Sequence, residues 1–75
     1  MEIDARESDL REVLVELKEI MCSACGQEVQ VEVVVRTYTD SKRVSAFALM
    51  SGCKTRIERN EEYCIVRIFG YACCV

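Results

Sequence analysis

The spacing of apolar residues changes abruptly after the first third of the chain, and this change limits the possible folds more than any single motif. Between Leu10 and Met21, apolar residues recur every three or four positions, which is the period of one face of an α-helix. From Val29 to Val35, valines alternate with mostly polar residues, as in a β-strand with one buried and one solvated face. The chain must therefore combine helices with a sheet that is exposed on one side.

Start and stop signals extend this pattern to the whole chain, with Ser8 or Asp9 as the expected N-cap of the first helix and Gly26 as its expected stop. The expected elements are, in order, a strand at residues 2–5, a helix at 9–24, a strand at 29–35, a helix from about 40 to 52, and strands at 55–59 and 63–69. Asp40 or Ser41 is expected to cap the second helix, whose apolar face is expected to include Val44, Phe47 and Ala48, with Met50 and Ser51 as further candidates. The order β-α-β-α-β-β predicts an α/β (α+β) two-layer sandwich, in which two helices cover one face of a four-stranded mixed sheet. A single domain is expected over residues 1–75.

Charge and residue usage argue against several classes of function. Ten basic and thirteen acidic residues give a net charge of -3, which offers no general attraction for a phosphate backbone, so no nucleic-acid partner is expected. No segment is apolar for long enough to cross a membrane, and a cytoplasmic location is expected. The absence of histidine removes the usual general base, and a classical enzyme is therefore not expected.

Six residues are cysteines, and the expected topology brings five of them to one end of the sheet. If the first three strands run parallel and the last returns through a hairpin, both helices and the last strand finish at the same end. Cys22 and Cys25 follow the first helix, Cys53 follows the second, and Cys73 and Cys74 follow the last strand. Four of these five are candidate ligands for Zn²⁺, which binds four thiolates at about 2.3 Å. Zinc is therefore the candidate cofactor, and an iron–sulfur cluster would use the same ligands.

The same thiols have other possible uses. Cys22 and Cys25 also have the Cys-x-x-Cys spacing of a redox or sulfur-transfer pair. Such pairs generally profit from a helix N-terminus, whereas this one follows a helix C-terminus, where the dipole disfavours a thiolate. Disulfides that join these cysteines to Cys53 or Cys73, and thiols without a ligand, are the remaining alternatives. Cys64 lies inside the last strand and is expected in the core.

Several segments together resemble the TusA/SirA family of small sulfur carriers over nearly the whole chain. They are "IDAR" at residues 3–6, "VEVVVRTYTD" at 31–40, a second helix containing Phe47, "SGC" at 51–53 and a closing hairpin. In this family, the cysteine of a Cys-Pro-x-Pro motif at the start of the first helix carries a persulfide. Aligned from Arg6, Leu10 occupies the position of that cysteine and Arg11 that of the first proline. Within "IDAR", Asp4 and Arg6 are expected to form an ion pair.

The resemblance implies a carrier or an interaction module in a sulfur-handling pathway, with a protein partner and with sulfurtransferase-like activity at most. Because Leu10 replaces the usual carrier cysteine, Cys22 and Cys25 are the remaining candidates to carry sulfur. The alternative function is that of a small structural or regulatory module that binds zinc.

Overall fold

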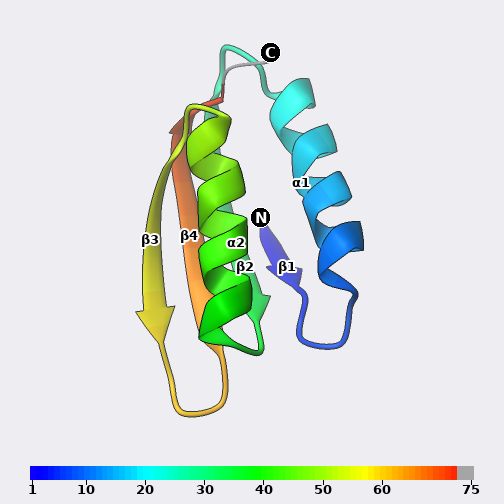
Figure 1. Cartoon of the computed structure of the whole chain (residues 1–75). Coiled ribbons are helices and arrows are strands. Elements are labelled where there is room, and N and C mark those ends of the chain that lie inside the picture. The colour runs from blue at the N-terminus through cyan, green and yellow to red at the C-terminus, as the bar shows by residue number, and fades with distance from the viewer. Residues whose placement is uncertain (73–75) are drawn as a thin grey trace.

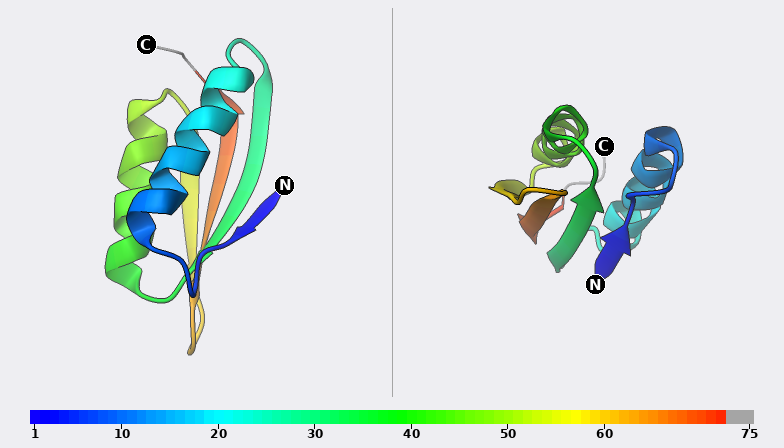
Figure 2. Two further views of the ribbon diagram at one scale, coloured as in Figure 1. Left: turned by 90° about the vertical axis from the view of Figure 1, so that its right-hand side faces the viewer. Right: turned by 90° about the horizontal axis from the view of Figure 1, so that it is seen from below.

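The computed structural model describes residues 1–72 and contains the predicted elements in the predicted order. They are β1 (Glu2–Asp4), α1 (Leu10–Ser23), β2 (Glu28–Val35), α2 (Tyr38–Met50), β3 (Lys54–Arg59) and β4 (Cys64–Tyr71). The four strands form one mixed sheet, and both helices cover the same face of it (Figure 1; Figure 2). The two-layer α+β sandwich expected from the sequence is therefore confirmed.

The strands lie in the order β1-β2-β4-β3. β1 is parallel to β2, while β4 is antiparallel to both β2 and β3, so the first three strands run the same way and the last runs back. Both helices run against the first three strands and finish where β2 and β3 begin (Figure 1). This is the topology that was expected to bring the cysteine-bearing segments to one end of the sheet.

The core lies between the sheet and the helices. On its sheet side, buried and exposed residues alternate along the strands. Every second residue of β2 is buried, and α1 contributes residues spaced by four. The buried side chains are Val29, Val31, Val33 and Val35 from β2, Val13, Leu17 and Met21 from α1, Val44 and Ala48 from α2, and Val66 and Ile68 from β4. Full burial of such a side chain contributes roughly 1.5–3 kcal/mol, which makes this face the main source of stability.

Helix α1 begins and ends where the sequence predicted. The side chain of Asp9 accepts a hydrogen bond from the backbone N–H of Arg11 at 3.1 Å and caps the helix. Gly26 follows the helix with φ at +81°, a conformation that glycine adopts without steric cost. Neither helix within the described residues is long and apolar enough to cross a membrane.

Helix α2 begins earlier than expected, and the predicted cap was wrong. Thr37 is the N-cap, and its hydroxyl accepts a hydrogen bond from the backbone N–H of Asp40 at 3.1 Å. Asp40 is thus the third residue of the helix, where a carboxylate is favoured by the positive end of the dipole. Met50 was also assigned wrongly to the apolar face, since it is 83% exposed. The buried stripe consists of Ser41, Val44, Ser45 and Ala48, whose spacing of three and four does not reach position 50.

Candidate functional site

The Cys-x-x-Cys segment lies at the end of α1. Cys22 is in the last turn of the helix and Cys25 is in the connection to β2, and both are exposed. The turn is held by backbone hydrogen bonds, one of which runs from the N–H of Gln27 to the carbonyl oxygen of Ala24 at 2.8 Å. The last turn of α1 contains no basic residue. The two thiols are therefore presented on a defined turn at the negative end of the helix dipole, as the sequence predicted.

Cys53 lies at the end of α2 and is buried, with 3% of its surface exposed. Its backbone N–H bonds to the carbonyl oxygen of Ala48, and the N–H of Gly52 bonds to that of Leu49, both at 3.1 Å. These two bonds form a Schellman motif, in which Gly52 takes φ of +90° and the residue after it packs back onto the last turn. Cys53 and Ala48 are both in the core, so Cys53 has a packing role at this end of the sheet.

The end of the sheet that carries these cysteines is called here the cysteine pole. The backbone N–H of Gly26 donates to the carbonyl oxygen of Ala72 at 3.3 Å, which ties the Cys-x-x-Cys segment to the end of the described chain. Cys73 and Cys74 follow Ala72 and lie outside the described residues. Within residues 1–72, no group of three or more cysteine or acidic side chains is arranged to hold a metal ion. The zinc set of Cys22, Cys25 and Cys53 with Cys73 or Cys74 extends beyond these residues and stays a prediction.

Cys64 does not belong to the cysteine pole. It is the first residue of β4, beside Val35 of β2, at the end of the sheet where the helices begin. Only 5% of its surface is exposed, and it is part of the hydrophobic core. The prediction of a core role for this cysteine is confirmed.

The opposite end of the sheet is called here the charged pole. Leu10, the first residue of α1, is half-buried and packs against the core, so an apolar side chain occupies the start of this helix. At the same end of the sheet, an open hollow is lined mainly by charged residues of β1, the loop before α1, the end of β2 and the β3–β4 turn. The residues that line it are Asp4, Arg6, Glu7, Ser8, Arg36 and Glu62.

Asp4 and Arg6 form the predicted ion pair at the charged pole. The guanidinium of Arg6 donates from Nε and Nη2 to the two carboxylate oxygens of Asp4 at 3.0 and 2.8 Å, and its backbone N–H donates to Oδ1 at 3.1 Å. These hydrogen bonds to Arg6 lower the pKa of Asp4 to about 2. The guanidinium also lies 5.5 Å from the centre of the Tyr63 ring. Asp4 and Arg6 are therefore paired and held in place at this pole.

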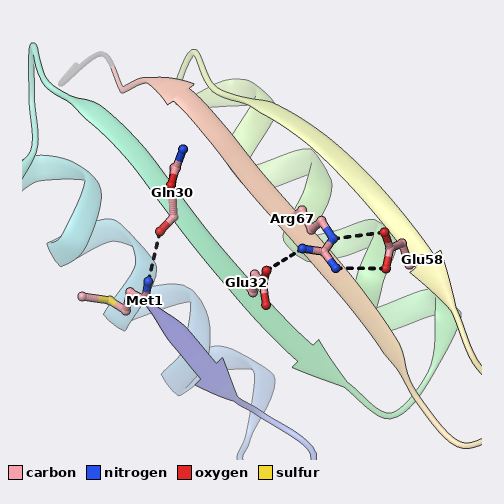
Figure 3. A network of polar contacts seen from close by, with 5 residues as sticks. All are labelled: Met1, Gln30, Glu32, Glu58 and Arg67. Atoms are coloured by element: carbon pink, nitrogen blue, oxygen red, sulfur yellow. Dashed lines mark hydrogen bonds and ion pairs between the residues drawn. The ribbon is translucent and has the colours of Figure 1, made fainter.

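A further set of charges, which the sequence did not reveal, lies on the face of the sheet that the helices leave uncovered, called here the open face. Arg67 in the central strand β4 donates to Glu58 on β3 at 3.1 and 3.2 Å and to Glu32 on β2 at 2.5 Å (Figure 3). The pair with Arg67 lowers the pKa of Glu58. Alternation along residues 29–35 predicted that Glu32 lies on the solvated face of its strand, and all three side chains are half-buried there. Whether these side chains contact one another depends on the register between the strands, and this register has no local sequence signal.

Comparisons with known proteins identify the fold. No protein-family model and no curated protein matches the sequence. Among solved structures, the crystal structure of the SirA-like protein from Desulfitobacterium hafniense superposes with a TM-score of 0.79. The match covers 93% of this chain and 96% of that chain at 17% sequence identity. At this identity the likeness establishes the fold, and the chain has the fold of a SirA-like protein.

Proposed function

We propose that the protein carries sulfur in a sulfur-handling pathway, and that the cysteine pole is where the sulfur is bound. The observation that supports this most is the exposure of Cys22 and Cys25 on a turn of a SirA-like fold. The sulfur-carrier family that the sequence resembles binds sulfur at the other pole, where this chain has the half-buried Leu10. The site of sulfur binding has thus moved along α1 from its first turn to its last.

The chemistry requires a persulfide donor, such as a cysteine desulfurase charged with sulfur. The thiolate of Cys22 or Cys25 attacks the outer sulfur of the donor's persulfide. A new S–S bond forms on this chain, the S–S bond of the donor breaks, and the donor keeps the electron pair as its thiolate. The second thiol of the pair can then attack the inner sulfur of the new persulfide, which forms a disulfide and releases hydrosulfide. An acceptor protein must therefore take the sulfur before the neighbouring thiol does.

The need for a donor and an acceptor makes protein partners part of the proposal. Lys18 precedes Cys22 by four residues, so the two side chains lie on the same face of α1, and its positive charge offsets part of the negative helix end. A basic group on the donor would complete the activation of the thiolate. The chemistry also requires reduced thiols, which is why we place the protein in the cytoplasm.

Sulfur loading from a cysteine desulfurase and labelled cysteine tests the proposal. We expect label on the wild-type protein and background levels on the Cys22→Ser/Cys25→Ser double variant. Ser23→Ala, an exposed position in the same turn, is the matched control and should load like the wild type. An unlabelled wild-type protein, or full loading of the double variant, would contradict the proposal.

A zinc-binding module is the second candidate function. The hydrogen bond from Gly26 to Ala72 favours it, because it joins the Cys-x-x-Cys segment to the residue that directly precedes Cys73. Cys22, Cys25 and either C-terminal cysteine, with Cys53 as the fourth ligand, would form a tetrahedral thiolate site that holds the chain end to α1. Native mass spectrometry of protein purified without chelator tests this directly. A measured mass equal to that of the bare or disulfide-linked chain would rule out a bound metal.

A further inference from the structure

The sheet has two edges, and that of β3 presents the longer strand to solvent. β1, at the other edge, has three residues, whereas β3 has six and pairs with β4 alone. No other segment of the described chain lies beyond β3 (Figure 1). An edge strand of this kind presents unpaired N–H and C=O groups, to which a further strand can bond.

The register shows which backbone groups of β3 face outward. In the turn after this strand, the N–H of Asn60 donates to the carbonyl oxygen of Tyr63 at 2.8 Å. Bonded positions recur at every second residue of an antiparallel pair, so the even-numbered residues of β3 bond to β4 and the odd-numbered ones face outward. The outward N–H and C=O groups belong to Thr55, Ile57 and Arg59, and no backbone hydrogen bond within residues 1–72 uses them.

One side of α2 runs along these outward groups. The guanidinium carbon of Arg59 lies 4.5 Å from the centre of the Tyr38 ring, and the hydroxyls of Ser45 and Thr55 are hydrogen-bonded. Lys42 follows Tyr38 by four residues, and its amino group lies 5.6 Å from the centre of the same ring. Helical spacing continues this row of side chains, which consists of Tyr38, Lys42, Ser45 and Leu49. The outward side of β3 and this row are together called here the β3 edge.

Most of the row is open to solvent although it adjoins the sheet. Tyr38 and Leu49 are 41% and 56% exposed, and Lys42 between them is exposed as well. Side chains alternate along a strand, so every second side chain of a strand added to β3 would lie beside this row. The β3 edge therefore offers backbone groups for pairing and exposed side chains for selecting a partner.

The β3 edge is basic in an acidic chain. Residues 38–59, which contain α2 and β3, include five basic and two acidic residues and so have a net charge of +3. Because the net charge of the whole chain is -3, the remaining residues have a net charge of -6. On β3 itself, the one acid is Glu58, which gives both carboxylate oxygens to Arg67. The bases at the edge are Lys42, Lys54, Arg56 and Arg59.

The neighbouring acids do not neutralise this edge. Asp40 is two positions from both Tyr38 and Lys42, so its side chain is on the other side of α2. Glu61 is exposed in the turn beyond β3, and Glu62 lines the hollow at the charged pole. Among the described residues, none of these acids forms an ion pair with a base of the β3 edge.

We propose that the β3 edge binds an extended acidic segment of a partner protein, which adds to the sheet as a further strand. The backbone of this segment pairs with the outward groups of β3. Its carboxylates contact Lys42 and Arg59 on the helix side of the sheet, and Lys54 and Arg56 on the open face. Backbone pairing supplies the affinity, and the four bases select for acid.

A second copy of this chain fits the β3 edge less well than an acidic partner. Along α2, Lys42 lies between Tyr38 and Ser45, which contact residues near the two ends of β3. A two-fold axis through the middle of β3 would therefore set Lys42 of one copy against Lys42 of the other, and the two basic edges would repel. Basic side chains guard an edge strand against such pairing, but the same charges attract an acidic strand.

Peptide binding to the full chain in reducing buffer tests the proposal, independently of the sulfur chemistry. The probe is a fluorescein-labelled peptide in which glutamate alternates with valine. Fluorescence anisotropy should show binding, and the peptide should slow the exchange of the outward amide hydrogens of Thr55, Ile57 and Arg59. The amides of Arg56 and Glu58, which are already bonded to β4, should change less.

Two further peptides separate strand addition from attraction between charges. Lysine in place of glutamate should abolish binding, because the edge is basic. N-methylation of every residue keeps the acidic charge but removes the N–H donors, and it should abolish binding as well. Three results would overturn the proposal: no binding of the glutamate peptide, equal binding of its methylated form, or binding that leaves the outward amides unprotected.

Charge reversal on the protein tests the role of the bases. Lys42→Glu/Arg59→Glu should bind the glutamate peptide on the order of 10-fold more weakly than the wild type and should gain binding of the lysine peptide. Arg11→Glu/Lys18→Glu, at exposed positions of α1, changes the net charge equally and should bind the glutamate peptide like the wild type. Circular dichroism establishes that each variant is folded.

Two outcomes of these measurements would contradict an acidic partner at this edge. Equal weakening by the two double variants would show that only the net charge matters. Protection of the outward amides that grows with protein concentration, in the absence of peptide, would show that a second copy occupies the β3 edge instead.

Discussion

At the charged pole the exposed side chains are mainly ionic and include the Asp4–Arg6 ion pair, whereas at the cysteine pole two exposed thiols stand at the C-terminal end of a helix. The charged pole has the positive end of the α1 dipole, which favours a thiolate, but the first residue of the helix there is the apolar Leu10. The cysteine pole has the thiols and the negative end of the same dipole. The favourable end of the dipole and the exposed thiols therefore lie at opposite ends of α1.

We first expect Cys64, at the charged pole, to contribute to stability. The exposed cysteines of the cysteine pole should instead carry the sulfur chemistry. Cys64→Ser should lower the free energy of unfolding by about 1–3 kcal/mol, because the substitution buries a hydroxyl in the hydrophobic core, where hydrogen-bond partners are scarce. Denaturant unfolding measures this loss, and sulfur loading of the folded variant should stay at the wild-type level. Loss of loading in folded C64S would place the chemistry at the charged pole.

Restoring a thiol to the charged pole tests the effect of the helix dipole. Leu10→Cys places a thiol at the first residue of α1, and at neutral pH it should react with an alkylating reagent roughly ten times faster than one in the middle of the helix. Val15→Cys, at a position that is 54% exposed, provides that reference. Mass spectrometry of tryptic peptides separates the sites. Equal rates at the two positions would mean that the dipole does not distinguish the poles.

The turn that presents the thiols depends on Gly26. Its φ of +81° costs an L-residue about 1 kcal/mol, although a Cβ at this position would meet no atom within 4 Å. Gly26→Ala should therefore lower the free energy of unfolding by about that amount through backbone strain alone. Gln27→Ala, an exposed neighbour, should change it by less than about 0.5 kcal/mol. Equal effects of the two variants would show that the turn does not require glycine.

The smallest effect concerns the ion pair at the charged pole. The pKa of Asp4 is lowered to about 2 from 3.8, so this ion pair is intact above pH 4 and is lost as the pH falls through about 2. Any stability it contributes is lost in the same window. An NMR titration of the Asp4 carboxyl should show the low midpoint in the wild type, and Arg6→Ala should return it toward 3.8. An unchanged midpoint in R6A would show that Arg6 is not the cause.

Elements with strong periodicity were predictable from the sequence. The helical spacing from Leu10 to Met21 and the alternating valines gave the two layers, and the Asp9 cap and Gly26 gave the bounds of α1. The start of α2 was missed because Thr37 and Asp40 both have side chains that can cap a helix, and only the geometry decides between them.

The candidate site was predictable only in part. Topology placed Cys22, Cys25 and Cys53 at one end of the sheet, which required nothing beyond the order of the elements and the direction of the last strand. The burial of Cys53 follows from the Schellman motif. Gly52 is the sequence signal of this motif, and its hydrogen bonds have no other. The contacts of Arg67 depend on strand register, which is set by long-range pairing.

Peptide mapping of the sulfur-loaded protein shows directly which cysteine carries the sulfur. Trypsin divides the cysteines among four peptides, residues 19–36 with Cys22 and Cys25, 44–54 with Cys53, 60–67 with Cys64, and 68–75 with Cys73 and Cys74. After incubation with a cysteine desulfurase and labelled cysteine, and alkylation without reductant, we expect label on the peptide of residues 19–36. Label confined to another peptide, or no label on any of the four, would contradict it.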